Sequence, residues 1–219
     1  MGIMKIQPAT HQIKAFTRTE LFVVIGVVAV LLVVILPALY SPDGRIHRSN
    51  CVNNLHQIGL AFRVWEGDNG DKYPMQIALT NSETIKLISS GNAYVLWQTM
   101  SNELSTPKIL HCDGDGQKTN AISFTQGFSD ANISYFFSLE ADDTYPQIIL
   151  DGDDNLAVNG VRVKPGILNL PTTNSLAWTK ERHHGNGNIG MADGSVQQTT
   201  SESLNSAVIA ATTFRLVIP

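Results

Sequence analysis

The sequence predicts an α+β fold, in which a long N-terminal helix is packed on a small antiparallel sheet, and three observations support this. The chain of 219 residues has an uncharged apolar run near its start, from Leu21 to Tyr40. A second segment, Arg45 to Trp65, returns to helical periodicity. Short apolar segments separated by Gly, Asn and Asp clusters then recur between residues 108 and 218.

The apolar run predicts a membrane helix over residues 16–40. At about 1.5 Å per residue, such a helix covers roughly the 30 Å of a bilayer core. A soluble helix of this length would need a polar face, and the run has none. We expect a kink at Pro37, because proline removes one backbone hydrogen bond. Lys5, Lys14 and Arg18 precede the run without an intervening acid, which favours a cytoplasmic N-terminus.

The start of the run carries a recognisable pattern. Lys14-Ala15-Phe16-Thr17, followed by Glu20 and the apolar residues, resembles the leader of type IV prepilins and of type II secretion pseudopilins. The resemblance implies a leader over residues 1–15 that a prepilin peptidase removes between Ala15 and Phe16, with methylation of the new amino terminus. It also implies that Glu20 sets the register of a filament by pairing with the amino terminus of a neighbouring subunit.

Two features of this segment depart from the family pattern. The family has Gly before the cut, where this chain has Ala15, and apolar residues where this chain has Arg18 and Thr19. Ala is small enough to be accepted, although cleavage could be slower. The alternative interpretation of Glu20 is an ordinary interfacial carboxylate beside a single-pass anchor.

Residues 41–74 are predicted to form a membrane exit and a stalk helix. The string 41–44, Ser-Pro-Asp-Gly, is typical of a turn. One apolar stripe at helical spacing should face the head: Cys51, Leu55, Ile58, Phe62 and Trp65. The string 51–61 resembles the CxNNLxQIGLA segment that follows the membrane helix in a large group of pilin-like proteins. Gly67, Asn69 and Gly70 should end the helix before Tyr73-Pro74.

Residues 75–219 are predicted to form one exported head, and the resemblance implies a pilin-like fold for it. Apolar spacing predicts helices at 92–104 and 201–211. Strands are predicted at 108–112, 133–139, 147–150, 176–179, 189–192 and 214–218.

Near the carboxyl end, His183 is followed by nine residues and then by Asp193-Gly194. This matches the His-x9-Asp-Gly signature of a prepilin-like family. Asp-Gly between apolar residues predicts a hairpin turn, which a histidine at the base of the other strand could hydrogen-bond. We interpret the pair as a structural brace rather than a catalytic or ligand-binding pair. The sequence offers no nucleophile at a recognisable elbow and no third ligand at metal spacing, so we predict neither an enzyme nor a metal site.

Two acidic strings, 113–116 and 151–154, carry alternating oxygen ligands that a calcium ion could use. Neither completes an EF-hand loop, because the position eleven residues after Asp113 is Phe124 where a glutamate is needed. Solvated turns are the preferred interpretation, and calcium is the one cofactor left open.

The two cysteines, Cys51 and Cys112, allow two interpretations: a disulfide between the stalk helix and the head, or two buried thiols. A bridge across this loop would stabilise the fold by up to roughly 4 kcal/mol in the chain-entropy model. His111 beside Cys112 is only a weak indication of zinc.

Composition limits the function. The net charge is -4 and no basic patch stands out, which gives no indication of nucleic-acid binding. The resemblance implies a single-pass protein of the bacterial inner membrane with a periplasmic head, assembled with other pilin-like subunits into a type II secretion or type IV pilus-like filament. A pilus subunit for adhesion or DNA uptake and a tethered binding domain that never assembles are the alternatives.

Overall fold

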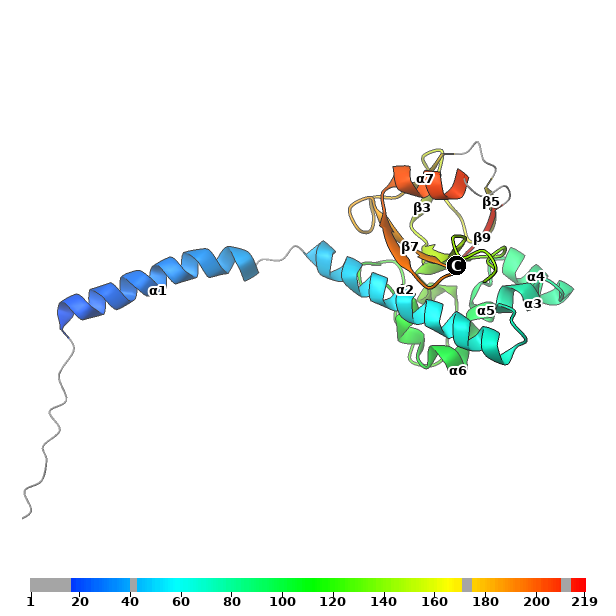
Figure 1. The fold of residues 1–219 in the computed structure, drawn as a ribbon, viewed down its shortest axis with the longest axis horizontal. Coiled ribbons are helices and arrows are strands. Elements are labelled where there is room, and N and C mark those ends of the chain that lie inside the picture. Colours follow the sequence, from blue (N-terminus) through cyan, green and yellow to red (C-terminus); the bar gives the residue numbers. More distant parts are fainter. Residues whose placement is uncertain (1–16, 40–42, 171–174, 210–213) are drawn as a thin grey trace, which may run out of the picture. The chain divides into compact units, whose positions relative to one another are not determined.

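The computed structural model describes residues 17–39, 43–170, 175–209 and 214–219 (Figure 1). The chain divides into two compact units, Met1–Ser41 and Pro42–Pro219, which are described separately. The predicted processing residues Ala15 and Phe16 lie outside the described residues.

The first unit contains helix α1, Arg18–Leu39. Its window Arg18–Ile35 has a mean hydropathy of 2.5, and none of it is buried. Among the described residues this is the one helix long and apolar enough to span a membrane. Pro37 lies inside α1, which continues to Leu39.

The second unit begins with helix α2, Asp43–Asp68, the predicted stalk helix. Asp43 and Gly44 belong to its first turn, so the turn predicted at 41–44 is wrong for these two residues, while Ser41 and Pro42 lie outside the described residues. The predicted stripe faces the core: Cys51, Leu55, Ile58 and Phe62 are at most 1% exposed, and Trp65 is partly buried. This face of α2 contacts β2, β7 and β8 of the sheet.

Short helices follow α2: α3 Pro74–Ala78, α4 Ser82–Ser89, α5 Tyr94–Thr99, α6 Ser101–Leu104, η1 Pro107–Leu110 and η2 Asp130–Asn132. The single helix predicted at 92–104 is interrupted at Met100, whose ψ of 17° departs from the helical value, although its apolar positions are buried as expected. The strand predicted at 108–112 is wrong. Pro107 begins a 3-10 turn there, and the Thr106 side chain accepts a hydrogen bond from Lys108 N.

The main sheet has six antiparallel strands in the order β5-β9-β1-β2-β7-β8. Their bounds are β1 Tyr135–Ser138, β2 Ile149–Asp153, β5 Gly166–Leu170, β7 Gly187–Met191, β8 Val196–Thr199 and β9 Phe214–Ile218. A second sheet of three strands has the order β4-β3-β6, with bounds β3 Leu156–Val158, β4 Val161–Arg162 and β6 Leu176–Trp178. The last helix is α7, Ser201–Ile209.

The two faces of the main sheet border different hydrophobic clusters, because successive side chains of a strand point to opposite faces. On β1, Tyr135 and Phe137 join the cluster that includes the α2 stripe, whereas Phe136 joins the cluster that includes α7. Figure 1 shows α2 and α7 on either side of the strands. The head is therefore a mixed helix and antiparallel-sheet structure, as predicted for the α+β class.

Candidate functional site

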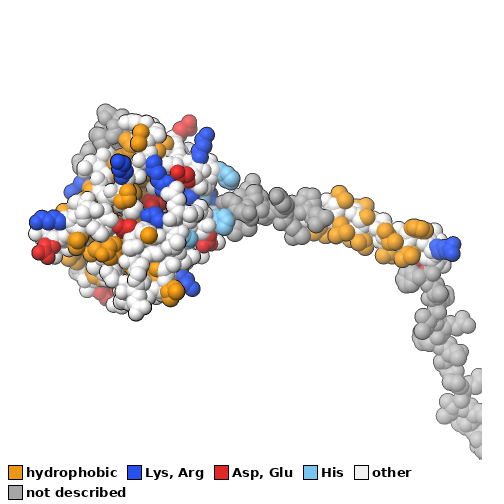
Figure 2. Space-filling model, turned by 180° about the vertical axis from the view of Figure 1, so that it is seen from behind, with side chains coloured by type: hydrophobic (Ala, Val, Ile, Leu, Met, Phe, Trp, Pro, Cys, Tyr) orange, Lys and Arg blue, Asp and Glu red, His pale blue; other side chains and the backbone are white. Residues whose placement is uncertain are grey.

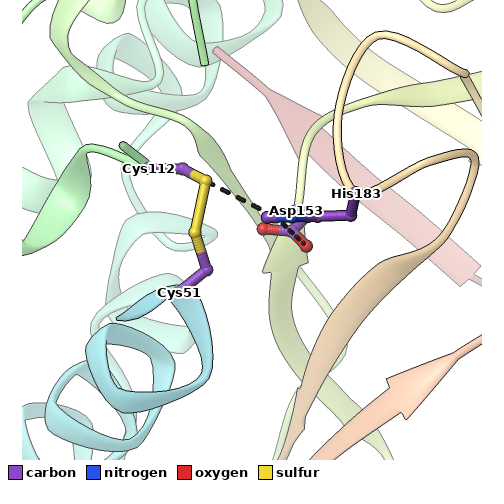
Figure 3. A group of neighbouring side chains, drawn as sticks. All are labelled: Cys51, Cys112, Asp153 and His183. Carbon is purple, nitrogen blue, oxygen red and sulfur yellow. Dashed lines mark hydrogen bonds and ion pairs between the residues drawn. A yellow bond between two sulfur atoms is a disulfide. The ribbon is translucent and has the colours of Figure 1, made fainter. Parts of the chain in front are cut away.

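The Cys51–Cys112 disulfide marks the centre of a buried polar cluster between α2 and β2 (Figure 3). Its Cα atoms are 5.6 Å apart and both residues are 0% exposed. Cys51 comes from the buried stripe of α2, and Cys112 follows η1. Of the two interpretations of the cysteine pair, the structure shows the disulfide, which links α2 covalently to the loop that follows η1.

His183 points toward this disulfide from the loop before β7. Its Nε2 lies 3.5 Å from Sγ of Cys112 and 3.5 Å from Oδ2 of Asp153. His183 and His184 both have positive φ, 49° and 57°, and only His183 is buried. The left-handed backbone thus directs the first histidine into the cluster.

The expected contact between His183 and the Asp193-Gly194 turn is wrong. The nine intervening residues include the whole of β7, which places His183 and the turn beyond opposite ends of that strand. Asp193 instead accepts hydrogen bonds from the Ser195 N–H, at 2.8 Å, and from the Gln147 amide, at 3.2 Å. Gly194 has a φ of 83° in the turn that joins β7 to β8, which suits glycine.

Asp153 is the carboxylate at the centre of the cluster, and it is 0% exposed. Its Oδ2 accepts hydrogen bonds from the backbone N–H and the side-chain amide of Asn188, both at 2.8 Å. Burial raises the pKa of Asp153 to about 6, while the charges of Arg182 and Arg48 oppose that rise. Arg48 of α2 is held nearby by hydrogen bonds to the Asn188 Oδ1 and the Gly187 carbonyl.

The imidazole of His183 is neutral at neutral pH. Burial, together with the nearby charges of Arg182 and Arg48, lowers its pKa to about 4. The contact between His183 and Asp153 is therefore one between a neutral ring and a carboxylate.

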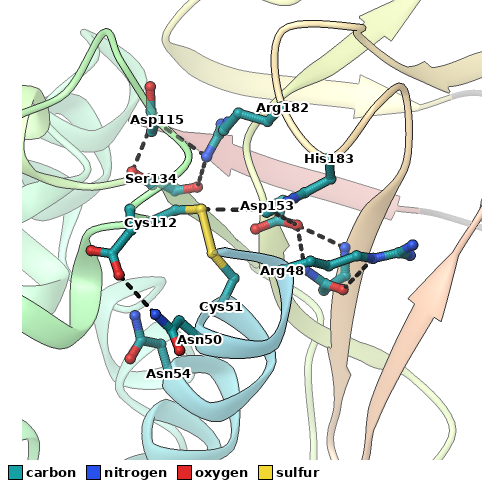
Figure 4. Close-up of a disulfide and its surroundings, with 12 residues drawn as sticks. Arg48, Asn50, Cys51, Asn54, Cys112, Asp115, Ser134, Asp153, Arg182 and His183 are labelled. Atoms are coloured by element: carbon teal, nitrogen blue, oxygen red, sulfur yellow. Dashed lines mark hydrogen bonds and ion pairs between the residues drawn. A yellow bond between two sulfur atoms is a disulfide. The ribbon is translucent and has the colours of Figure 1, made fainter. Parts of the chain in front are cut away.

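A second group of buried charges lies beside the disulfide, and Figure 4 shows its arginine, Arg182, next to Asp115. Arg182 forms ion pairs with Asp115 of the first string, at 3.3 Å, and with Asp154 of the second. Its Nη1 also donates to the Ser134 carbonyl at 3.1 Å, and the Ser134 hydroxyl donates to Asp115 at 2.9 Å. The Arg182 guanidinium thus supplies positive charge between these carboxylates, and the Lys118 ammonium, 3.8 Å from Asp154, adds to it.

The interpretation of residues 151–154 as a solvated turn is wrong. Asp151 and Asp153 lie in β2 and Asp154 follows it, and all three are at most 5% exposed. Burial, together with the charge of Asp153, raises the pKa of Asp151 well above its usual range. The first string differs, because Asp113 is exposed while Asp115 is buried against Arg182.

A polar cleft of about 300 Å³ opens at the surface beside α2. It is lined by Asn50, Asn53, Asn54, Lys108, Ile109, His111, Asp113 and Asn120. The Asn50 amide donates to Asp113 at 3.0 Å, and the Asn54 amide donates to the His111 carbonyl at 3.1 Å. His111 Nε2 lies 3.3 Å from the carbonyl of Lys118, so this nitrogen is engaged outside the disulfide cluster.

In the first unit, Glu20 caps its own helix. Its Oε2 accepts hydrogen bonds from the N–H and the hydroxyl of Thr17, both at 2.8 Å, and the Thr17 hydroxyl accepts from the Glu20 N–H at 3.2 Å. This is a capping box, the reciprocal arrangement of Thr-x-x-Glu at a helix start. The string Thr17-Arg18-Thr19-Glu20 carried that signal, which our sequence interpretation did not use.

The sequence pattern did not reveal the buried cluster, because its members are far apart in the chain. We expected His183 to brace the Asp193-Gly194 turn and Asp153 to lie in a loop, whereas the structure brings both to the disulfide. Asn188 and Arg48 belong to no motif that we recognised in the sequence.

Comparison of the chain with protein-family models, with curated proteins and with solved structures finds no match.

Proposed function

We propose that this chain is a prepilin-type membrane protein, processed between Ala15 and Phe16, that assembles as a pseudopilin-like subunit through its apolar N-terminal helix. The assembly is a type II secretion or type IV pilus-like filament. Its partners are a prepilin peptidase, other pilin-like subunits and the lipid bilayer. The chain itself catalyses no reaction in this proposal.

The observation that carries the proposal is the bare apolar surface of α1. Large apolar side chains from Leu21 to Ile35 are 47% to 72% exposed. Figure 2 shows this apolar surface along the helix. Such a surface requires lipid or the helices of neighbouring subunits, and a filament that is extracted from a membrane uses both in turn.

The head supports an extracytoplasmic location. A buried disulfide between α2 and the loop after η1 is characteristic of proteins that fold in an oxidising compartment. Together with Lys5, Lys14 and Arg18 before the span, it favours an inner-membrane protein with a cytoplasmic N-terminus and a periplasmic head. The position of α2 on an antiparallel sheet is compatible with the pilin-like fold proposed for this head.

Glu20 variants test the assembly. Glu20→Gln keeps a capping oxygen for Thr17 but removes the charge, and Thr17→Ala removes the capping hydroxyl but keeps the charge. If Glu20 pairs with the amino terminus of a neighbour, Glu20→Gln abolishes crosslinked or sheared filaments while Thr17→Ala retains them. Normal assembly of Glu20→Gln would contradict the proposed role.

N-terminal sequencing of the protein from its native membrane tests the processing. The expected first residue is a methylated Phe16. Recovery of Met1 would instead support a permanently anchored protein.

A second candidate function is a membrane-tethered binding domain that does not assemble, and the polar cleft beside α2 favours it. Deletion of the gene separates the candidates: a secretion subunit predicts loss of an exported protein, and a pilus subunit predicts loss of surface fibres. For a tethered binding domain, alanine substitutions at Asn50 and Asn53 in the cleft would abolish function without altering membrane insertion.

A further inference from the structure

Four side chains bring potential metal ligands to one point of the buried cluster: Cys51, Cys112, Asp153 and His183. The two sulfurs, one carboxylate oxygen and one imidazole nitrogen all lie within 4.8 Å of one another (Figure 3). They come from α2, the loop after η1, β2 and the loop before β7. All four residues are at most 7% exposed.

The spacing of these atoms suits a tetrahedral zinc site. With Zn–S bonds of about 2.3 Å and Zn–N or Zn–O bonds of about 2.0–2.2 Å, neighbouring ligands in a tetrahedron are roughly 3.3–3.8 Å apart. The Cys112 Sγ to His183 Nε2 distance and the His183 Nε2 to Asp153 Oδ2 distance are both 3.5 Å. The two bonded sulfurs are closer than this range, and they can separate only after the S–S bond is broken.

The surroundings also suit a metal. Oδ1 of Asp153 is buried and has no hydrogen-bond partner among the described residues, whereas Oδ2 is held by Asn188. The two hydrogen bonds from Asn188 fix the carboxylate with Oδ2, the oxygen 3.5 Å from His183 Nε2, in the cluster, so the proposed ligand has its outer support in place. Two thiolates, one carboxylate and one zinc ion carry a net charge of about -1, which the nearby Arg48 and Arg182 offset.

We propose that Cys51, Cys112, Asp153 and His183 form a tetrahedral zinc site when the disulfide is reduced. A dithiol reductant supplies two electrons and two protons and becomes a disulfide itself, while the Cys51–Cys112 bond gives two thiols. Zinc then displaces both thiol protons to solvent and forms two Zn–S bonds, one Zn–N bond and one Zn–O bond. The metal replaces the covalent link between α2 and the loop after η1.

This inference is independent of the proposed filament function, since it concerns only the head. It predicts two states of the same cluster. In the oxidised state the cysteines form the disulfide and no metal is bound, and in the reduced state they bind zinc. Because the sulfurs are buried, reduction requires opening of the head.

The test uses the full chain in detergent micelles. The protein is unfolded in denaturant, reduced with a phosphine, and refolded without oxygen in the presence of Zn²⁺ or of a chelator. We expect one zinc ion per reduced chain by metal analysis after desalting, and none in the oxidised chain. Zinc should also raise the melting temperature of the reduced chain, because it binds the folded state. Co²⁺ in place of zinc should give the visible absorption of a tetrahedral thiolate site.

Matched histidine variants identify the site. His183→Gln removes a proposed ligand, and His184→Gln changes an exposed neighbour that has the same positive φ. Loss of an outer support typically weakens metal binding about 10–100-fold, so we expect at least about 100-fold weaker zinc binding in His183→Gln and no change in His184→Gln. Asp153→Asn should weaken binding similarly.

Three results would overturn the proposal. They are the absence of zinc from the refolded reduced chain, equal zinc binding by His183→Gln and the wild type, and failure of zinc to raise the melting temperature of the reduced chain. Equal binding by the variant would assign the metal to the thiols alone.

Discussion

Gly59 of α2 lies against Gly194 in the turn between β7 and β8: a Cβ on Gly59 would stand 3.8 Å from the Gly194 Cα. Arg63, one helical turn further on, donates a hydrogen bond to the Ala192 carbonyl at 2.9 Å. The helix string at 51–61 and the Asp193-Gly194 turn are therefore in contact, although they were identified from separate patterns. The turn therefore packs against α2, and not against His183 as the sequence analysis expected.

Substitutions at Gly59 test this contact. A separation of 3.8 Å accommodates one methyl group, so Gly59→Ala should stabilise the head by about 0.5–1 kcal/mol through helix propensity. Gly59→Val adds two carbons beyond that methyl position, and we expect their collision with the turn to cost about 1–3 kcal/mol. Urea unfolding followed by circular dichroism measures both. Gly67→Val is the control, because nothing lies within 4 Å of a Cβ there. Equal effects of valine at the two positions would contradict the contact.

Arg182→Met tests the buried ion network. It leaves the Asp115 and Asp154 carboxylates buried without the guanidinium that pairs with them, which should cost about 3–5 kcal/mol of unfolding free energy. The control is Arg162→Met, which breaks an exposed pair with Glu181 and should cost less than about 1 kcal/mol. Similar losses in the two variants would show that the network contributes no more than a surface pair.

The sequence predicted the elements whose periodicity reflects burial on one side. The α2 stripe is buried on one face, and the strand predicted at 214–218 has the bounds of β9. The helix predicted at 201–211 is observed as α7 at Ser201–Ile209. These segments are regular because each packs one face against a core.

Sequence patterns did not predict the elements in which charged residues are buried. Asp151 and Asp153 look like loop residues, yet they lie in β2, where Asn188 and the nearby arginines compensate for the burial of Asp153. Local composition cannot reveal partners that are supplied by distant strands. Likewise β5, at Gly166–Leu170, is an edge strand whose burial alternates poorly, and no strand was predicted there.

Calcium removal is a further test of the acidic strings. Because Arg182 already occupies the space between Asp115 and Asp154, we expect a chelator to leave the melting temperature unchanged. Thermal melts with added Ca²⁺ and with chelator measure this. A shift of several degrees would restore calcium as a ligand of the head.

Glu66, near the end of α2, predicts a pH dependence of stability. Burial, together with a hydrogen bond to the Asp143 carboxyl, raises the pKa of Glu66 to about 7. Between its ordinary pKa of 4.5 and about 7, the folded chain holds a proton that the unfolded chain has lost. Stability should therefore fall with rising pH in this window, by up to about 1.4 kcal/mol per pH unit from this group.

Glu66→Gln removes that proton equilibrium. The variant should be more stable than the wild type at pH 8 and similar to it at pH 4, because the wild-type carboxyl is neutral at the lower pH. Urea unfolding at a series of pH values measures the difference. Glu83→Gln, which makes the same change at an exposed position at the start of α4, is the matched control. A Glu66→Gln profile parallel to that of the wild type would show that the buried carboxyl titrates normally.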